Sequence, residues 1–191
     1  LGARLAAMTF DAVLSSPLQR AVCTAEIAGY VHPRLTPLLG EVDYGDYEGI
    51  TSKEIRARNP DWQLYRDGCP GGETPEQIYT RATEFIRLCE TIDGRVLAFG
   101  HGHILRAVAV AWVRLDITAA AGFQLDVATL NRLHDDPEHG RLIAMWNAPG
   151  EASLSRGGAG SRSCFAPRGA PRRPGRPRCR RRRDRCGARR G

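Results

Sequence analysis

The chain has 191 residues, which is enough for one domain with a hydrophobic core of its own. Its formal net charge is +7, but residues 151–191 hold 14 of its 28 Lys and Arg residues and only two of its 21 Asp and Glu residues, so the first 150 residues are acidic. This distribution argues against a body that binds nucleic acid, and no apolar run reaches the ~18 residues that a membrane-spanning helix needs.

The first predicted elements are short and alternate between helix and strand. Residues 1–8 read as the end of a helix, and the apolar run 10–15 predicts a buried strand. Ser16-Pro17 is a helix-start signal, with serine as N-cap and proline as the first helical residue, and this helix closes at Gly29. A second strand is predicted over 35–39.

The middle of the chain is punctuated by loops. Residues 41–49 form an acidic, glycine-containing loop, and Thr51-Ser-Lys-Glu54 resembles a capping box that opens a short helix. Asn59-Pro60 stops that helix, and 67–75 is a second loop rich in Gly and Pro. Thr74-Pro75 then repeats the cap-and-proline signal.

The helix after Thr74-Pro75 places one apolar stripe on its surface, formed by Ile78, Ala82, Phe85, Ile86 and Cys89. Residues 96–99 read as a buried strand, and 104–115 as a helix that is apolar nearly all round and therefore packed on both sides. Two more strands are predicted around 124–133 and 141–146. Strands alternating with helices predict an α/β domain with a largely parallel sheet.

The composition changes near Ala148-Pro149. Residues 149–191 consist mainly of Arg, Gly, Pro, Ala and Ser without periodicity, so we expect a disordered tail beside a domain that spans 1–148. The same mixture would result from a shifted reading frame in a GC-rich gene, which we hold as a hypothesis. The domain has three cysteines without metal-ligand spacing, which favours reduced thiols and a cytoplasmic protein: Cys23, Cys69 and Cys89.

Two strand-to-helix junctions carry the candidate chemistry. Arg20 and Arg106 each lie in the first turn of a predicted helix, where a cation is unfavourable unless an anion shares the site. His101 and His103 belong to the second junction, and in a parallel sheet both junctions reach the same edge. Phosphate is the natural ligand for such a set. The alternatives are solvated surface arginines, a capping or core role for His103, and a metal site, which lacks further ligands at suitable spacing.

The acidic loop offers a proton donor. Most of its carboxylates are expected to be solvated, but one beside an arginine-rich phosphate site could protonate a leaving alkoxide if its pKa were raised. Spacing alone does not choose among Glu41, Asp43, Asp46 and Glu48.

Four motifs in order resemble the histidine phosphatase superfamily, the phosphoglycerate-mutase-like proteins. They are Ser15-Ser-Pro-Leu-Gln-Arg-Ala21, Glu41-Val-Asp-Tyr-Gly-Asp-Tyr-Glu-Gly49, Pro70-Gly-Gly-Glu-Thr74 and Phe99-Gly-His-Gly-His-Ile-Leu-Arg106. The resemblance covers Leu1 to about Asn147 and implies an α/β fold with helices on both faces of a mostly parallel sheet. Tyr65-Arg-Asp-Gly-Cys69 is most similar to the sugar-phosphatase branch that includes sedoheptulose-1,7-bisphosphatases.

The resemblance implies a role for each matching residue. Arg20 would hold the phosphoryl oxygens, Glu41 would be the proton donor, and His101 would stabilise the transferring phosphoryl group. Substrate-binding residues would be Ser16, Tyr44, Gly102 and Arg106. For Arg106 we expect a contact with a second phosphate, and the alternative is an ion pair with Asp43 or Asp46.

The sequence departs from the family pattern at its start. The family's nucleophile lies in an Arg-His-Gly motif at the end of the first strand, and none of the fourteen residues before Ser15 is His. We therefore expect that this chain lacks the nucleophile and the central strand that carries it, and that it is inactive as it stands.

The resemblance implies an intact phosphatase that acts on a small phosphorylated metabolite, a sugar phosphate or bisphosphate, without a metal or cofactor. Three alternatives stay open: phosphoglycerate mutase-type phosphotransfer, a non-catalytic phosphate-binding module, and non-specific nucleic-acid binding through the arginine-rich tail. The sequence makes no prediction of oligomeric state.

Overall fold

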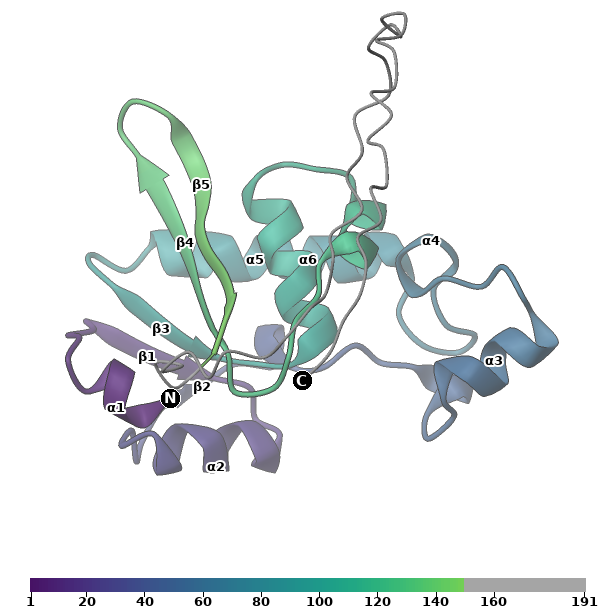
Figure 1. The fold of residues 1–191 in the computed structure, drawn as a ribbon, viewed down its shortest axis with the longest axis horizontal. Coiled ribbons are helices and arrows are strands. Elements are labelled where there is room, and N and C mark those ends of the chain that lie inside the picture. The colour runs from purple at the N-terminus through teal and green to yellow at the C-terminus, as the bar shows by residue number, and fades with distance from the viewer. Residues whose placement is uncertain (150–191) are drawn as a thin grey trace, which may run out of the picture. The chain divides into compact units, whose positions relative to one another are not determined.

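The computed structural model describes residues 1–149, which form an α/β domain (Figure 1). The expected disorder of the tail and its origin concern residues outside the described part. The helices and strands, in chain order, are α1 (Gly2–Leu5), β1 (Ala12–Ser15), α2 (Gln19–Ile27), β2 (Arg34–Leu35), α3 (Ser52–Arg58), α4 (Leu64–Asp67), α5 (Pro75–Glu90), β3 (Val96–Phe99), α6 (Gly102–Trp112), β4 (Leu130–Asp136) and β5 (Gly140–Ala148), with 3-10 turns at Pro37–Leu39, Gly45–Tyr47 and Ile117–Gly122.

The central sheet has three parallel strands in the order β2-β1-β3. Leu14 of β1 is aligned with Arg34 on one side and with Ala98 on the other. Because all three strands run in the same direction, their carboxyl ends lie at one edge. The predicted α/β class with a parallel sheet is confirmed.

Helices cover both faces of this sheet (Figure 1). Side chains alternate between the faces along a strand, so Leu14 packs into the core formed with α5 and α6. Leu97 and Phe99 face the opposite way and pack against Leu5 of α1 and Ala25 of α2. The burial of apolar side chains on both faces holds the strand ends in place.

Helix α6 is buried all round, as its sequence predicts. Five consecutive residues, Ala107 to Ala111, are buried, so every face of the helix packs against protein. Among residues 1–149, no helix has both the length and the apolar character needed to cross a membrane.

Strands β4 and β5 form a separate antiparallel hairpin. It contacts the domain through Trp112 at the end of α6, whose indole Nε1 donates to the carbonyl of Leu142 at 3.0 Å. The first of these strands begins at Leu130, later than the predicted 124–133, and the second extends to Ala148. Within the described residues, β3 pairs with β1 alone.

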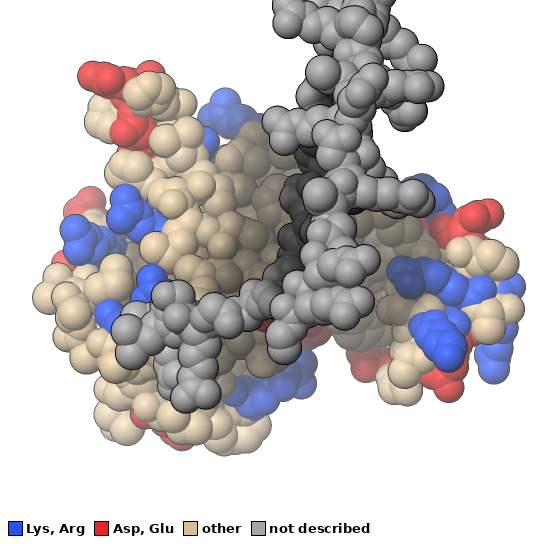
Figure 2. Space-filling view, in the orientation of Figure 1, with Lys and Arg blue, Asp and Glu red and all other residues tan. Residues whose placement is uncertain are grey.

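The capping box predicted at Thr51 is present, and the N-cap predicted at Thr74 also forms a capping box. Thr51 accepts from the backbone N–H of Glu54 at the start of α3, and Thr74 accepts from that of Gln77 at the start of α5. Each box satisfies N–H groups that a helix terminus leaves without partners. At the right margin of Figure 2, over α3 and α4, basic and acidic side chains are interspersed.

Ser16 is not the N-cap of the helix that follows it. The helix starts at Gln19, and its N-cap is Leu18, which offers no side-chain hydrogen bond. Ser16 Oγ instead accepts from the N–H of Leu18 at 3.2 Å and contacts the ring of His101 at 2.8 Å. The Ser16 side chain is thus held by His101 of another element, and the helix that Ser16-Pro17 predicts starts only at Gln19.

Two other predicted boundaries also differ. The strand predicted over 35–39 pairs only as far as Leu35, because Pro37 lacks an N–H and opens a 3-10 turn capped by Thr36. Helix α6 runs from Gly102 to Trp112, so both ends lie two or three residues before those predicted. The short helix α4, which ends at Asp67 where the loop predicted over 67–75 begins, was not predicted.

Candidate active site

Two strand ends bring Ser16 and His101 together. β1 ends at Ser15 and β3 ends at Phe99, which are register partners, and the N–H of Ser16 donates to the carbonyl of Phe99 at 2.8 Å. Two residues further on, His101 Nε2 lies 2.8 Å from Ser16 Oγ, and both side chains are buried. The structure thus joins the two predicted junctions at the carboxyl edge of the sheet.

Arg20 reaches the same point from the first turn of α2. Its Nε donates to His101 Nδ1 at 3.0 Å. Because Nδ1 accepts, the proton of a neutral ring lies on Nε2 and faces Ser16 Oγ. Burial and then the charge of Arg20 lower the pKa of His101, with Glu41 acting in the opposite direction. An anion between Arg20 and His101 would favour the charged ring instead.

Glu41 lies at the amino end of α6. Its Oε1 accepts from the backbone N–H of Val42 at 3.0 Å and of Ile104 at 3.1 Å, and its Oε2 accepts from that of His103 at 3.3 Å. The N-cap residue of α6, His101, makes no side-chain capping bond. Glu41 therefore supplies the cap from a distant segment, and its negative charge faces the positive end of the helix dipole.

This position decides the charge of Glu41. Burial by itself raises the pKa of the carboxyl, but the hydrogen bond and charge of His103 and the N–H groups of Val42 and Ile104 lower it to about 2. The sequence analysis expected a proton donor with a raised pKa, whereas the pKa of the Glu41 carboxyl is lowered. An approaching phosphate anion would shift the balance back toward the protonated acid.

Two further predicted substrate-binding residues are Tyr44, which contacts His103 beside this cap, and Arg106, which lies further along α6. The Tyr44 hydroxyl is 2.5 Å from His103 Nδ1. Arg106 Nε is buried and has no hydrogen-bond partner within the described residues, where Arg106 also forms no ion pair with Asp43 or Asp46. Burial raises the pKa of Tyr65, and the nearby charge of Arg106 opposes that rise.

Gly102 lies between the two histidines as the first residue of α6. A Cβ added there would meet no heavy atom within 4 Å, so the backbone faces open space. Its assignment to substrate binding stays a prediction.

The acidic loop is fixed by a close crossing of two backbones. Gly45 has φ +51°, and a Cβ there would lie 2.3 Å from the backbone of Pro70 and of Gly72. The N–H of Asp46 donates to the carbonyl of Pro70, and that of Glu73 to the carbonyl of Asp43. Gly45 and Gly72, one from each motif, are therefore required by contact between the loops.

Two functional candidates, Tyr65 and Arg81, were not predicted from the sequence, whereas His103 was among the predicted ligands of an anion and lies beside Glu41. Arg81 of α5 donates from two nitrogens to Glu73, each at 2.7 Å, and to the carbonyl of Gly40 at 2.7 Å, beside Glu41. Its spacing of three residues from Ile78, on the apolar stripe, is the signal that could have identified it.

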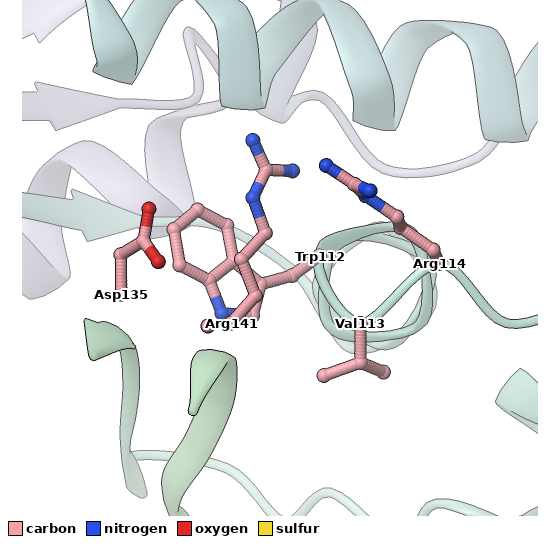
Figure 3. A pocket seen from close by; sticks show the side chains of 6 residues that line it. Trp112, Val113, Arg114, Asp135 and Arg141 are labelled. Carbon is pink, nitrogen blue, oxygen red and sulfur yellow. The ribbon is translucent and has the colours of Figure 1, made fainter. Parts of the chain in front are cut away.

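A cavity of about 320 Å³ lies elsewhere, at the carboxyl end of α6 (Figure 3). Trp112, Arg114 and Arg141 line it, with the guanidinium of Arg141 4.6 Å from the centre of the Trp112 ring. His101 and Trp112 lie at opposite ends of α6, so this cavity is separate from the candidate site. Within residues 1–149, no group of three His, Cys, Asp or Glu residues is arranged to hold a metal ion.

Comparison with known families agrees with this geometry. The model of the histidine phosphatase superfamily (branch 1) matches residues 1–148. An acid phosphatase from Mycobacterium tuberculosis is 40% identical over 120 residues, which are 62% of this chain and 59% of that protein. A sedoheptulose 1,7-bisphosphatase from Saccharomyces cerevisiae is 32% identical over 115 residues, or 51% and 42% of the two chains. The chain spans about half the length of these relatives.

Solved structures share the fold. The product of an open reading frame from Mycobacterium tuberculosis matches with a TM-score of 0.74 and 35% identity, over 78% of this chain and 79% of that one. A mycobacterial glucosyl-3-phosphoglycerate phosphatase matches with a TM-score of 0.66 over 78% and 82%. Its identity is 21%, so this second likeness shows the fold alone.

Proposed function

Because the chain belongs to the histidine phosphatase superfamily, branch 1, we propose that it forms the substrate site of a phosphomonoesterase that works through a phosphohistidine. The proposed substrate is a small phosphorylated metabolite, a sugar phosphate or bisphosphate, and the similarity to a sedoheptulose 1,7-bisphosphatase supports that class. The observation that carries the proposal is the convergence of Arg20, His101 and Ser16 at the ends of β1 and β3.

Each residue has a proposed part in the reaction. A histidine attacks phosphorus as the bond to the sugar oxygen breaks, and Glu41 donates its proton to that oxygen. Water then attacks the phosphohistidine, gives its proton back to Glu41, and releases inorganic phosphate. Arg20 and His101 stabilise the charge on the equatorial phosphoryl oxygens throughout.

We propose that the attacking histidine comes from a segment preceding Leu1. The sequence contains no Arg-His-Gly triplet. Within the described residues β3 pairs only with β1, so its second edge is available to a further strand. We expect the 191-residue chain by itself to bind phosphate without turning over a substrate.

The test uses the protein extended at its amino end by this segment, with an aryl phosphate as substrate. Arg20→Ala and His101→Ala should each lower kcat by about two to four decades, or ~3–5 kcal/mol of transition-state stabilisation. Arg58→Ala, on the exposed face of α3, is the matched control and should leave kcat unchanged. Rates close to the parent in both site variants would contradict the assignment.

A second candidate is a phosphate-binding module without catalysis. It is favoured by a site whose Arg20, His101 and Ser16 contacts are already assembled within a chain that contains no Arg-His-Gly triplet. Phosphate binding by the extended protein without an acid-labile phosphohistidine would identify the module, whereas a phosphohistidine would identify the enzyme.

A further inference from the structure

His103 makes more contacts within the candidate site than the proposed mechanism uses. Its backbone N–H donates to Glu41 Oε2, and its carbonyl accepts from the Tyr65 hydroxyl at 2.9 Å. The ring packs edge-on against Tyr44, with centroids 5.6 Å apart, and lies 6.1 Å from the ring of Tyr65. His103 is thus held from two sides and lies directly against the proposed proton donor.

One ring nitrogen of His103 has two neighbours. Nδ1 is 2.5 Å from the Tyr44 hydroxyl and 3.6 Å from Glu41 Oε2. A ring nitrogen presents either a proton or a lone pair, never both. The state of Nδ1 therefore determines what Glu41 faces.

We propose that His103 is a positioning residue for Glu41, which directs the carboxylate through its backbone N–H and governs, through the charge of its ring, whether Glu41 carries the proton. The proposal rests on the function proposed above, in which Glu41 is the proton donor and base.

The two ring states favour opposite forms of Glu41. With both ring nitrogens protonated, the positive charge of the ring and the Nδ1–H favour the carboxylate, which is the form needed as a base. With a bare Nδ1, the single lone pair of the nitrogen accepts from the Tyr44 hydroxyl, and the neutral ring offers Glu41 neither a proton nor a positive charge. Burial then favours the protonated acid, which is the form needed to protonate a leaving oxygen.

Other charged or titratable groups also act on Glu41 and its neighbours, and a test must separate them from His103. Glu41 shares electrostatic interactions with His101, Tyr44 and Tyr65, Glu48 acts on Tyr44, and Arg106 acts on Tyr65. None of these donates a hydrogen bond to the Glu41 carboxylate within the described residues, whereas His103 donates its backbone N–H and also places its ring Nδ1 3.6 Å from Glu41 Oε2.

The first measurement follows the Glu41 carboxyl carbon by NMR during a pH titration of the extended protein. His103→Asn keeps an N–H donor near the place of Nδ1 without the charge, and His103→Phe removes both but keeps a ring between the two tyrosines. Both variants retain the backbone N–H. His139→Asn is the control, because that histidine pairs with Asp136 at the β4–β5 turn.

In both His103 variants the Glu41 titration midpoint should rise by at least about one pH unit, a tenfold change in proton affinity. The His139 control should titrate as the parent does. A midpoint in His103→Asn equal to that of the parent would overturn the proposal, because the ring charge would then have no effect on Glu41. If the phenylalanine variant does not fold, the asparagine variant still decides the question.

The second measurement compares two substrates in the extended protein. An alkyl phosphate needs a proton on its leaving oxygen, whereas an aryl phosphate with a good leaving group does not. For the alkyl phosphate, His103→Asn should move the alkaline limb of the pH profile of kcat/KM upward by about one pH unit. For the aryl phosphate, kcat/KM should stay within about twofold of the parent value. Equal losses on both substrates would show a merely structural role and overturn the proposal. If the parent hydrolyses neither substrate, the proposed function fails, and the carboxyl titration still decides the role of His103.

Discussion

The side chain of Glu41 makes the free energy of unfolding depend on pH. Its pKa in the folded protein is about 2, against about 4.3 for an exposed glutamate, so the unfolded chain binds the proton first as the pH falls. The ionised carboxylate therefore stabilises the fold above about pH 4.3, by up to roughly 3 kcal/mol. This contribution disappears as the pH falls toward 2.

Glu41→Gln should remove this pH dependence. The variant should be less stable than the parent near neutral pH, and the difference should shrink as the pH falls from about 5 to about 3. Urea unfolding across that range measures the effect, with Glu26→Gln on the exposed side of α2 as the control. A difference that is independent of pH would mean that shape, and not charge, makes Glu41 stabilising.

Arg106 bears on the choice of substrate. Its buried Nε has no hydrogen-bond partner in the described part of the chain, and such a group is costly unless a ligand pairs with it. Its position five residues beyond His101 suits a second anion on a substrate whose first phosphate, in the function proposed above, is held by Arg20 and His101.

Arg106→Ala in the extended protein should therefore raise KM for sugar bisphosphates at least about tenfold, or ~1.4 kcal/mol. Turnover of a small monophosphate should change little. Equal losses on the two substrates would assign Arg106 to the reacting phosphoryl group or to the fold, and the bisphosphate class should then be abandoned.

At the scale of elements, helix α5 holds the loop that carries Glu41. Arg81 forms a two-nitrogen bond to Glu73, with side chains 17% and 19% exposed, and also donates to carbonyls of Leu38 and Gly40. The same Glu73 accepts from the N–H of Asp43. One guanidinium thus fixes both loops beside the site.

Arg81→Met should cost about 3–5 kcal/mol of unfolding free energy, because it leaves the carboxylate of Glu73 half-buried without its partner. The same substitution at Arg87, exposed on the same helix, should change stability by less than about 0.5 kcal/mol. Chemical denaturation of the two variants makes the comparison. Similar small losses in both would mean that solvent replaces the Arg81 bonds without penalty.

At the scale of the whole molecule, the domain contains two separate sheets. The three-stranded sheet ends at β3, and the β4–β5 hairpin forms its own pair. A strand edge with unpaired N–H and C=O groups can associate with other chains. The proposed preceding strand would cover the edge of β3 within the same molecule.

The 191-residue chain should therefore self-associate when purified, as measured by light scattering after size exclusion. Hydrogen exchange should show poor protection of β3 relative to β1, which pairs on both sides. The extended protein should lose this association and gain protection in β3. A monodisperse 191-residue chain with well-protected β3 amides would contradict the proposed strand.

Local elements could largely be predicted from the sequence, because the interactions that form them lie within a few residues. The capping box at Thr51, the N-cap at Thr74, the buried strand 96–99 and the two-sided burial of α6 are of this kind. Predictions failed where a side chain that local sequence assigned to a helix cap is bound by a residue far away in the chain. Ser16 contacts His101, 85 residues away, and so does not cap the helix beside it.

The residues of the candidate site were identifiable, but not their charge states. By itself the sequence determined that Arg20 and His101 follow the ends of two strands, and parallel strands bring such ends to one edge. Only the tertiary structure decided that Glu41 caps α6 with a lowered pKa and that His103 lies against it. These properties depend on burial and on the directions of N–H groups from segments 62 residues apart. Spacing along the chain does not encode them, because they arise only when the helix terminus and the loop are packed together.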